Sequence, residues 1–183
     1  MYTGNRMSAY TLTLFLHITS VLVLFLAFGI EWAAISFLGK TSTSEESVHW
    51  LRLAKLGPLI NGPALLLAIL SGGYLASLIS AFKQGWVPAS FIGIAIVALL
   101  GGVINAPKMR AIRLAIPKGG QALTVALKTK ALPVSVRLRT FTALAIVFTM
   151  TAKLPFGQCM LALLGGLLLG LLFSIPVFTR KLA

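Results

Sequence analysis

The first long apolar stretch of the chain, residues 10–38, carries a histidine, His17, and a carboxylate, Glu31, among mostly apolar side chains. As a helix its 29 residues would be about 43 Å long, more than the roughly 30 Å hydrocarbon core of a bilayer. The two ionisable residues fall on one helical face about 21 Å apart. Because ionisable side chains avoid lipid, we expect this face to point into a helix bundle.

The composition indicates a membrane protein. Of the 183 residues, 58% are hydrophobic and 10% are charged, and the mean hydropathy is +0.97, which excludes an ordinary soluble fold. Sixteen Lys and Arg against three acids give a formal charge of +13, which alone would suit nucleic acid or anionic lipid. The aromatic residues lie within or at the ends of apolar runs, so we favour lipid and expect no nucleic-acid partner.

The apolar runs predict an all-α polytopic transmembrane bundle of five spans in a single membrane domain, 1–183. The first run is too long for the core of a secretory signal, so we interpret it as a retained helix. A basic loop, residues 105–139, precedes the fourth span. The predicted spans are about 10–38, 59–82, 87–104, 137–153 and 158–178.

Two boundaries depend on local signals. Thr43 followed by Glu46 is a capping-box pattern and predicts a short interfacial helix within residues 41–56, which Gly57 and Pro58 would end. Pro107 predicts the end of the third span near residue 104, with a kinked continuation as the alternative.

Two glycine patterns predict close packing. In the second span, residues 71–73 read Ser-Gly-Gly and predict a surface for a close helix neighbour. In the fifth span, Gly166 and Gly170 form a small-xxx-small pattern, which could serve either the bundle or an oligomer.

The distribution of Lys and Arg predicts the orientation. With five spans, the segments on one side hold three, eight and two cations, and each segment on the other side holds one. We therefore expect the N-terminus outside and the C-terminus in the cytoplasm. Two amphipathic helices on the cytoplasmic face would bind anionic lipid headgroups. The headgroup contacts predicted in the basic loop are Lys108, Arg110, Arg113, Lys118, Lys128, Lys130, Arg137 and Arg139.

Three residues are candidates for intramembrane function. His17 could bind copper or haem iron or relay protons; the alternative is a buried histidine bonded to a neighbouring carbonyl or hydroxyl. Glu31 could carry a proton, although an interfacial position near Lys40 is the favoured interpretation. Lys153 could neutralise a buried carboxylate or a headgroup, or extend to the outer surface.

A copper site built from soft ligands near the outer side is a less favoured interpretation. Thioether, thiolate and imidazole groups suit reduced copper, whereas methionine is also an ordinary filler of apolar helices. The residues concerned are His17, Met150, Cys159 and Met160, together with Met7. A further pair of polar residues, Asn61 and Asn105, could bond each other, but the favoured interpretation is that they are interhelical hydrogen-bond donors or lie at helix ends.

Several short motifs resemble an uncharacterised bacterial family of small integral membrane proteins, a domain of unknown function. They are Leu16-His17, Gly62-Pro63, the run of residues 70–75 and Lys153 near Pro155. The chain is more distantly similar to CopD-type copper-resistance membrane proteins, which also have a leucine-histidine pair in an early span. The chain departs from the family pattern where Leu154 separates Lys153 from Pro155. The resemblance implies a membrane bundle located in a bacterial inner membrane, and it marks His17 and Lys153 as characteristic positions.

No nucleophile elbow, phosphate loop, zinc motif or carboxylate pair is visible, so we expect no enzymatic activity. The sequence favours a non-enzymatic membrane accessory or assembly component, with a membrane protein partner or a homo-oligomer as its assembly. The alternative is copper, haem or proton handling or transport through His17. No cofactor is required by the sequence under the first hypothesis.

Overall fold

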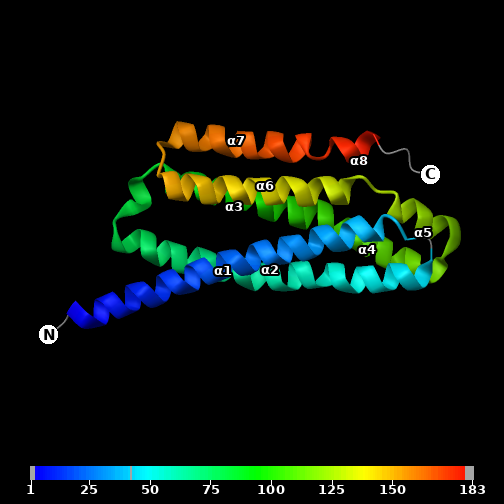
Figure 1. Ribbon diagram of the computed structural model, residues 1–183, viewed down its shortest axis with the longest axis horizontal. Helices are drawn as coiled ribbons and strands as arrows, with labels where there is room; N and C mark the ends of the chain where they lie inside the picture. Colours follow the sequence, from blue (N-terminus) through cyan, green and yellow to red (C-terminus); the bar gives the residue numbers. More distant parts are fainter. Residues whose placement is uncertain (1–2, 42, 180–183) are drawn as a thin grey trace.

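The computed structural model describes residues 3–41 and 43–179, with the backbone alone for residues 3–8 and Ser44. In these residues every regular element is a helix, and successive long helices run in alternating directions (Figure 1). The long elements are α1 (Thr3–Leu38), α2 (Ser44–Leu78), α3 (Trp86–Leu99), η2 (Leu100–Asn105), α4 (Ala106–Ala115), α6 (Ala131–Ala152) and α7 (Phe156–Leu172). The short elements are η1 (Ala81–Lys83), η3 (Ile116–Lys118), α5 (Gly120–Leu127) and α8 (Ile175–Thr179).

Five helical segments are long and apolar enough to cross a membrane. The first four have 30 to 34 residues, or about 45–51 Å of helix, and therefore exceed the roughly 30 Å hydrocarbon core. Large apolar side chains cover their outer faces, as at Phe15, which is 63% exposed. This is the surface expected of a bundle whose solvent is lipid. The segments are Ala9–Leu38, Glu45–Leu78, Trp86–Lys118, Gly120–Ala152 and Phe156–Thr179.

In the structure, the second helix does not end at residues 57–58, where the sequence predicted a break. Its start is as predicted, since Thr43 is the N-cap and its Oγ1 accepts a hydrogen bond of 3.3 Å from the backbone N–H of Glu46. From there α2 continues without interruption, with Pro58 and Pro63 inside it. A proline removes one backbone donor, but neighbouring helices and local adjustments can hold such a helix together in a membrane protein. The separate interfacial helix was therefore a wrong prediction.

The third span also runs on past its predicted end. A π-helical turn, η2, follows α3, and the backbone N–H of Ala106 bonds the carbonyl of Gly101 before α4 begins. This wider turn lies directly before Pro107, where the ordinary helical hydrogen bond is lost. The continuation, not the termination at residue 104, is thus the observed structure.

The basic loop is helical, as expected, but part of it belongs to the bundle. Ile112 of α4 is buried in an apolar cluster with Leu38 of α1, Leu51 of α2 and Val136 of α6. A short turn, η3, contains Pro117, and the fourth long helix already begins at Ala131. One face of α4 therefore packs against the ends of three long helices.

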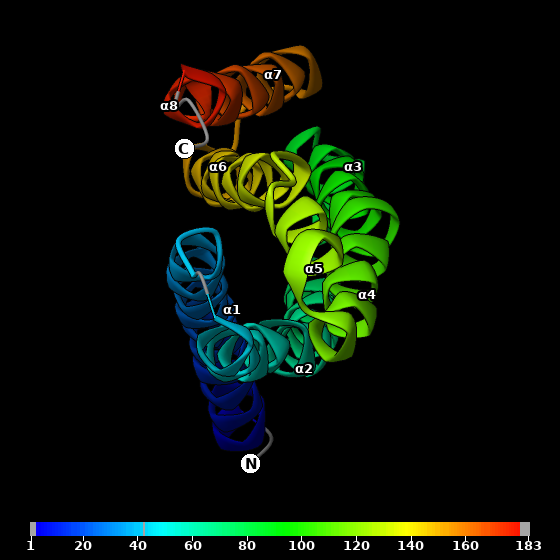
Figure 2. The ribbon, with the colours of Figure 1, turned by 90° about the vertical axis from the view of Figure 1, so that its right-hand side faces the viewer.

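Glycines set the distance between α6 and α7. A Cβ atom on Gly166 would lie 2.8 Å from the carbonyl oxygen of Phe141, and one on Gly170 would lie 2.9 Å from the Cα of Leu138. At these distances a Cβ atom would clash, so only the hydrogen atom of a glycine fits at either position. The small-xxx-small pattern therefore serves the bundle itself, and Figure 2 shows α7 on the side of α6 remote from α1 and α2.

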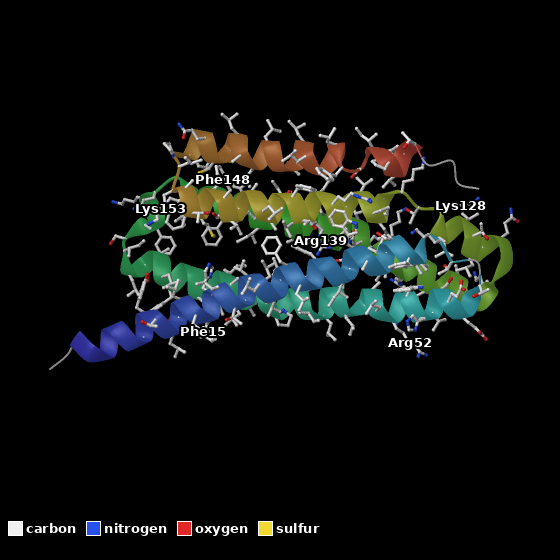
Figure 3. The ribbon with its side chains drawn as sticks, viewed as in Figure 1. Phe15, Arg52, Lys128, Arg139, Phe148 and Lys153 are labelled. Carbon is white, nitrogen blue, oxygen red and sulfur yellow. The ribbon has the colours of Figure 1, made fainter. Side chains whose placement is uncertain are left out.

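The two ends of the bundle differ in charge. The links from α1 to α2 and from α4 to α6 lie at one end, which we call the basic end (Figure 1). Figure 3 places Lys128 at this end and Lys153 at the opposite end. Arg180 and Lys181, which also enter the predicted charge distribution, lie outside the described residues. The cations of the basic end are Lys40, Arg52, Lys55, Lys108, Arg110, Arg113, Lys118, Lys128, Lys130 and Arg137.

Candidate functional site

An ion pair inside the bundle joins the first long helix to the fourth. Nη1 of Arg139, on α6, donates to both carboxylate oxygens of Glu31, on α1, at 3.0 and 2.9 Å. Nδ2 of Asn105, at the end of η2, donates to Oε1 of Glu31 at 2.6 Å. The exposed fractions of Glu31, Arg139 and Asn105 are 1%, 6% and 3%. We call these three residues the buried polar cluster; Figure 3 shows Arg139 between α6 and α1.

Two glycines and a phenylalanine shape the space around this cluster. A Cβ atom on Gly57 of α2 would lie 3.0 Å from the Cβ of Glu31, and one on Gly101 of η2 would lie 3.4 Å from the Cζ of Arg139. The guanidinium also lies 5.0 Å from the centre of the Phe28 ring, within the range of a cation–π contact. The predicted break at residues 57–58 is thus the place where α2 passes close to Glu31.

The cluster corrects three interpretations of the sequence. Glu31 is not interfacial beside Lys40, whose Nζ instead lies 5.3 Å from the ring centre of Phe37. Arg139 does not face lipid headgroups, because its guanidinium is committed to Glu31. Asn61 and Asn105 do not bond each other, since neither side-chain atom of Asn61 has a hydrogen-bond partner among the described residues; Asn105 is an interhelical donor to Glu31, as the favoured interpretation has it. In the low-dielectric interior, the attraction between Glu31 and Arg139 is stronger than the attraction of either residue to exposed charges that are close to it in the sequence.

The polar character of the interior extends beyond the ion pair. Asn61 lies one helical turn after Gly57, and Thr142 lies three residues after Arg139, so both are on the faces that point toward the cluster. Because α2 and α6 both run opposite to α1, these two residues lie on the side of the cluster nearer to His17. Buried polar atoms with no hydrogen-bond partner among the described residues are both side-chain atoms of Asn61, Oδ1 of Asn105, Nε of Arg139 and Oγ1 of Thr142.

His17 connects α1 to α2 by hydrogen bonds at a second position along α1, nearer to the start of the helix than Glu31. Its Nδ1 lies 3.0 Å from the carbonyl oxygen of Ala68 and 3.2 Å from Oγ of Ser71. A carbonyl can only accept, so Nδ1 carries the proton in this bond, and in a neutral imidazole Nε2 then has a free lone pair. The ring lies against Gly72, where a Cβ atom would be 2.8 Å from its Cε1. The close-packing surface predicted at residues 71–73 is therefore occupied by His17.

The soft ligands predicted for copper are brought only partly together. His17 and Met150 line the same small apolar cavity of about 60 Å³ between α1, α2, α3 and α6. Cys159 is fully buried with its Sγ 3.2 Å from the Leu154 carbonyl, in an apolar cluster against which Met150 and Met160 pack. The side chain of Met7 is outside the described part of the chain. Among residues 3–41 and 43–179, no three His, Cys, Asp or Glu side chains are grouped for a metal ion.

The remaining cations predicted to meet headgroups differ in their surroundings. Lys130 donates to the Phe178 carbonyl at 3.3 Å, and the guanidinium of Arg137 lies 5.2 Å from the ring centre of Trp32. Lys153 is exposed at the opposite end, where it caps α6 with a φ of 51°. The cations of this group that are exposed are Lys108, Arg110, Arg113, Lys118 and Lys128.

The fold and the buried polar cluster define a class: a small all-α protein with five helices that are long and apolar enough to cross a membrane. Comparisons with protein-family models, with curated proteins and with solved structures found no match to this chain. The resemblance to a bacterial integral membrane family and to CopD-type proteins therefore stays a prediction from the sequence motifs.

Proposed function

We propose that this chain is a multi-pass membrane protein that acts as a non-enzymatic accessory or assembly component. The observation that carries the proposal is the Glu31–Arg139 ion pair, completed by Asn105. The two charged side chains neutralise each other and join α1 to α6, so they serve as a fixed support. A fixed bundle with an apolar exterior is suited to hold a membrane partner or a second copy of itself.

We further propose that the basic end faces the cytoplasm of a bacterial cell, with the N-terminus outside and the C-terminus inside. The excess of Lys and Arg in the links of the basic end supports this orientation, since such residues are retained on the cytoplasmic side. Their contacts with anionic lipid headgroups would each contribute about 1 kcal/mol near the surface.

Cysteine labelling tests this orientation. In a Cys159→Ser background, Lys83→Cys places a thiol at the opposite end and Gln121→Cys places one at the basic end; both positions are exposed. Removing Lys83 takes a cation from the outer side and therefore does not work against the proposed orientation. In intact cells, a membrane-impermeant maleimide is expected to label the Lys83→Cys variant, and to label the Gln121→Cys variant only after the cells are opened. Labelling of both variants from the same side would contradict a five-span arrangement.

A second candidate function is copper, haem or proton handling at His17. The specific observation in its favour is that His17 and Met150 line one cavity and that Nδ1 of His17 bonds a carbonyl, which in a neutral imidazole leaves the lone pair of Nε2 free. An imidazole nitrogen and a thioether are both suitable ligands for reduced copper.

Elemental analysis separates the two candidates. Copper and iron would be measured in the detergent-purified protein and in its His17→Ala and His49→Ala variants, the latter removing an exposed histidine as the matched control. An accessory role predicts less than about one metal atom per ten chains in all three proteins. About one atom per chain in the wild type and His49→Ala, lost in His17→Ala, would overturn the accessory proposal in favour of metal handling.

A further inference from the structure

A groove opens at the basic end between the end of α1, the link from α5 to α6, and α8. Its volume is about 290 Å³. Four cations line it: Lys40 from the link after α1, Lys128 and Lys130 from the link between α5 and α6, and Arg137 from α6. None of the described residues that line it is acidic. A concave surface whose described residues carry four positive charges and no negative charge concentrates a positive potential, which attracts an anion.

The contacts of two of these lysines leave their charge available to a ligand. Nζ of Lys130 lies on a neutral carbonyl, that of Phe178, and Nζ of Lys40 lies above the Phe37 ring. Carbonyls and rings orient a cation but do not neutralise it, and lysine and arginine are the usual partners of phosphate. The side chain of Arg137 is positioned at the groove by a hydrogen bond of 3.0 Å from its Nη1 to the carbonyl oxygen of Pro133.

The shortest candidate span indicates where the groove would lie in a bilayer. This span, Phe156–Thr179, has 24 residues, which as a helix would be about 36 Å long, close to the hydrocarbon thickness of a bilayer. In a bilayer centred on this span, its end at the basic side would lie near the edge of the hydrocarbon layer, at the depth of a headgroup. Lys130 is bonded to Phe178, at this same end. Ile35, Leu127 and Val177 supply apolar surface in the same groove.

We propose that this groove is a binding site for a phosphate group, and that the phosphate belongs to an anionic lipid. The four cations would hold the phosphate, and the apolar side chains would take the first part of an acyl chain. The inference rests on the proposed function in one respect, that the basic end lies at a membrane surface. It goes further because it assigns one defined site instead of a general attraction of the basic loop for headgroups.

The test is a titration of the purified full-length protein with phosphatidylglycerol in detergent, followed by native mass spectrometry. Lys128→Gln/Lys130→Gln removes two cations of the groove. Arg110→Gln/Arg113→Gln removes two exposed cations of α4 that do not line the groove, and is the charge-matched control. Lys128→Gln alone is a milder variant at an exposed position, in case the double variant does not fold.

The expected loss of affinity is about 5-fold for each lysine, and therefore about 25-fold for the groove double variant. The control should bind phosphatidylglycerol as the wild type does, phosphatidylcholine should bind equally weakly to all variants, and inorganic phosphate should not displace the lipid.

Equal losses in both double variants, or no loss in the groove variants, would overturn the site. Displacement of the lipid by millimolar inorganic phosphate would overturn its assignment to lipid. Failure of the proposed orientation would appear instead in cysteine labelling, which this titration in detergent does not depend on.

Discussion

Replacing Arg139 with methionine is expected to lower the free energy of unfolding by about 3–5 kcal/mol. The substitution keeps an apolar stem of similar length but takes the guanidinium away from the buried Glu31 carboxylate, to which Asn105 would still donate. A buried charge that loses its partner is far more costly than the pair itself. Thermal unfolding and titration with a denaturing detergent, compared with the wild type, measure the change.

Arg137→Met is the matched control for this prediction. Arg137 lies two residues before Arg139 on α6, but it is half-buried, and its guanidinium lies over the Trp32 ring and donates to the carbonyl of Pro133. Loss of a cation–π contact of this kind costs about 0.5–1 kcal/mol. Equal destabilisation by the two substitutions would mean that Arg139 acts through its general position on α6 and not through Glu31.

Replacing Gly166 with alanine is expected to destabilise the protein by about 1–3 kcal/mol, the usual cost of overpacking. The new methyl group would meet the Phe141 carbonyl oxygen at 2.8 Å and the Cβ of Ala145 at 2.9 Å. Both obstacles are rigid parts of α6, so α7 must move away from it. The melting temperature of the purified variant reports the loss.

Gly165→Ala provides a control of opposite sign. A Cβ atom on Gly165 meets nothing within 4 Å, so alanine there gains helix propensity, by up to about 1 kcal/mol, without a clash. The two variants carry the same glycine-to-alanine substitution at adjacent positions of α7. If Gly166→Ala were as stable as Gly165→Ala, α6 and α7 would not be in the close contact described above.

The sequence was sufficient for the helical class and for much of the local geometry. Long apolar runs indicate spanning helices because lipid cannot hydrogen-bond the backbone, whereas a helix pairs its own N–H and C=O groups. The cap at Thr43 depends on residues three positions apart, and the packing at Gly166 and Gly170 depends on the absence of side chains on one helical face. Such signals are local and can be read without knowledge of the fold.

The prediction of helix ends from proline was less successful. Pro58 and Pro107 are signals for helix termination in water, where a freed carbonyl can find a solvent donor and an alternative turn. In this bundle the helix continues through Pro58, and a π-helical turn precedes Pro107. Tertiary packing of Gly57 against Glu31 and of Gly101 against Arg139 holds both segments in place.

The buried polar cluster could be predicted only in part. Glu31 was recognisable as a buried candidate because a carboxylate within an apolar run requires a partner. Its partner, Arg139, is 108 positions away and follows a run of other Lys and Arg residues, so its residue type offered no reason to separate it from them. A distinguishing signal exists, since Arg139 is directly followed by the apolar run of the fourth span and lies one helical turn deeper than Ser135, which is also buried.

The most direct test of the central claim is a double-mutant cycle between Glu31 and Arg139. The free energy of unfolding would be measured for the wild type, Glu31→Gln, Arg139→Met and the double variant. The structure predicts a coupling energy of about 2–3 kcal/mol, with the double variant more stable than Arg139→Met alone, because no unpaired charge remains buried. Effects that add to within about 0.5 kcal/mol would show that the two side chains do not interact, and would contradict the ion pair as the link between the first and fourth spans.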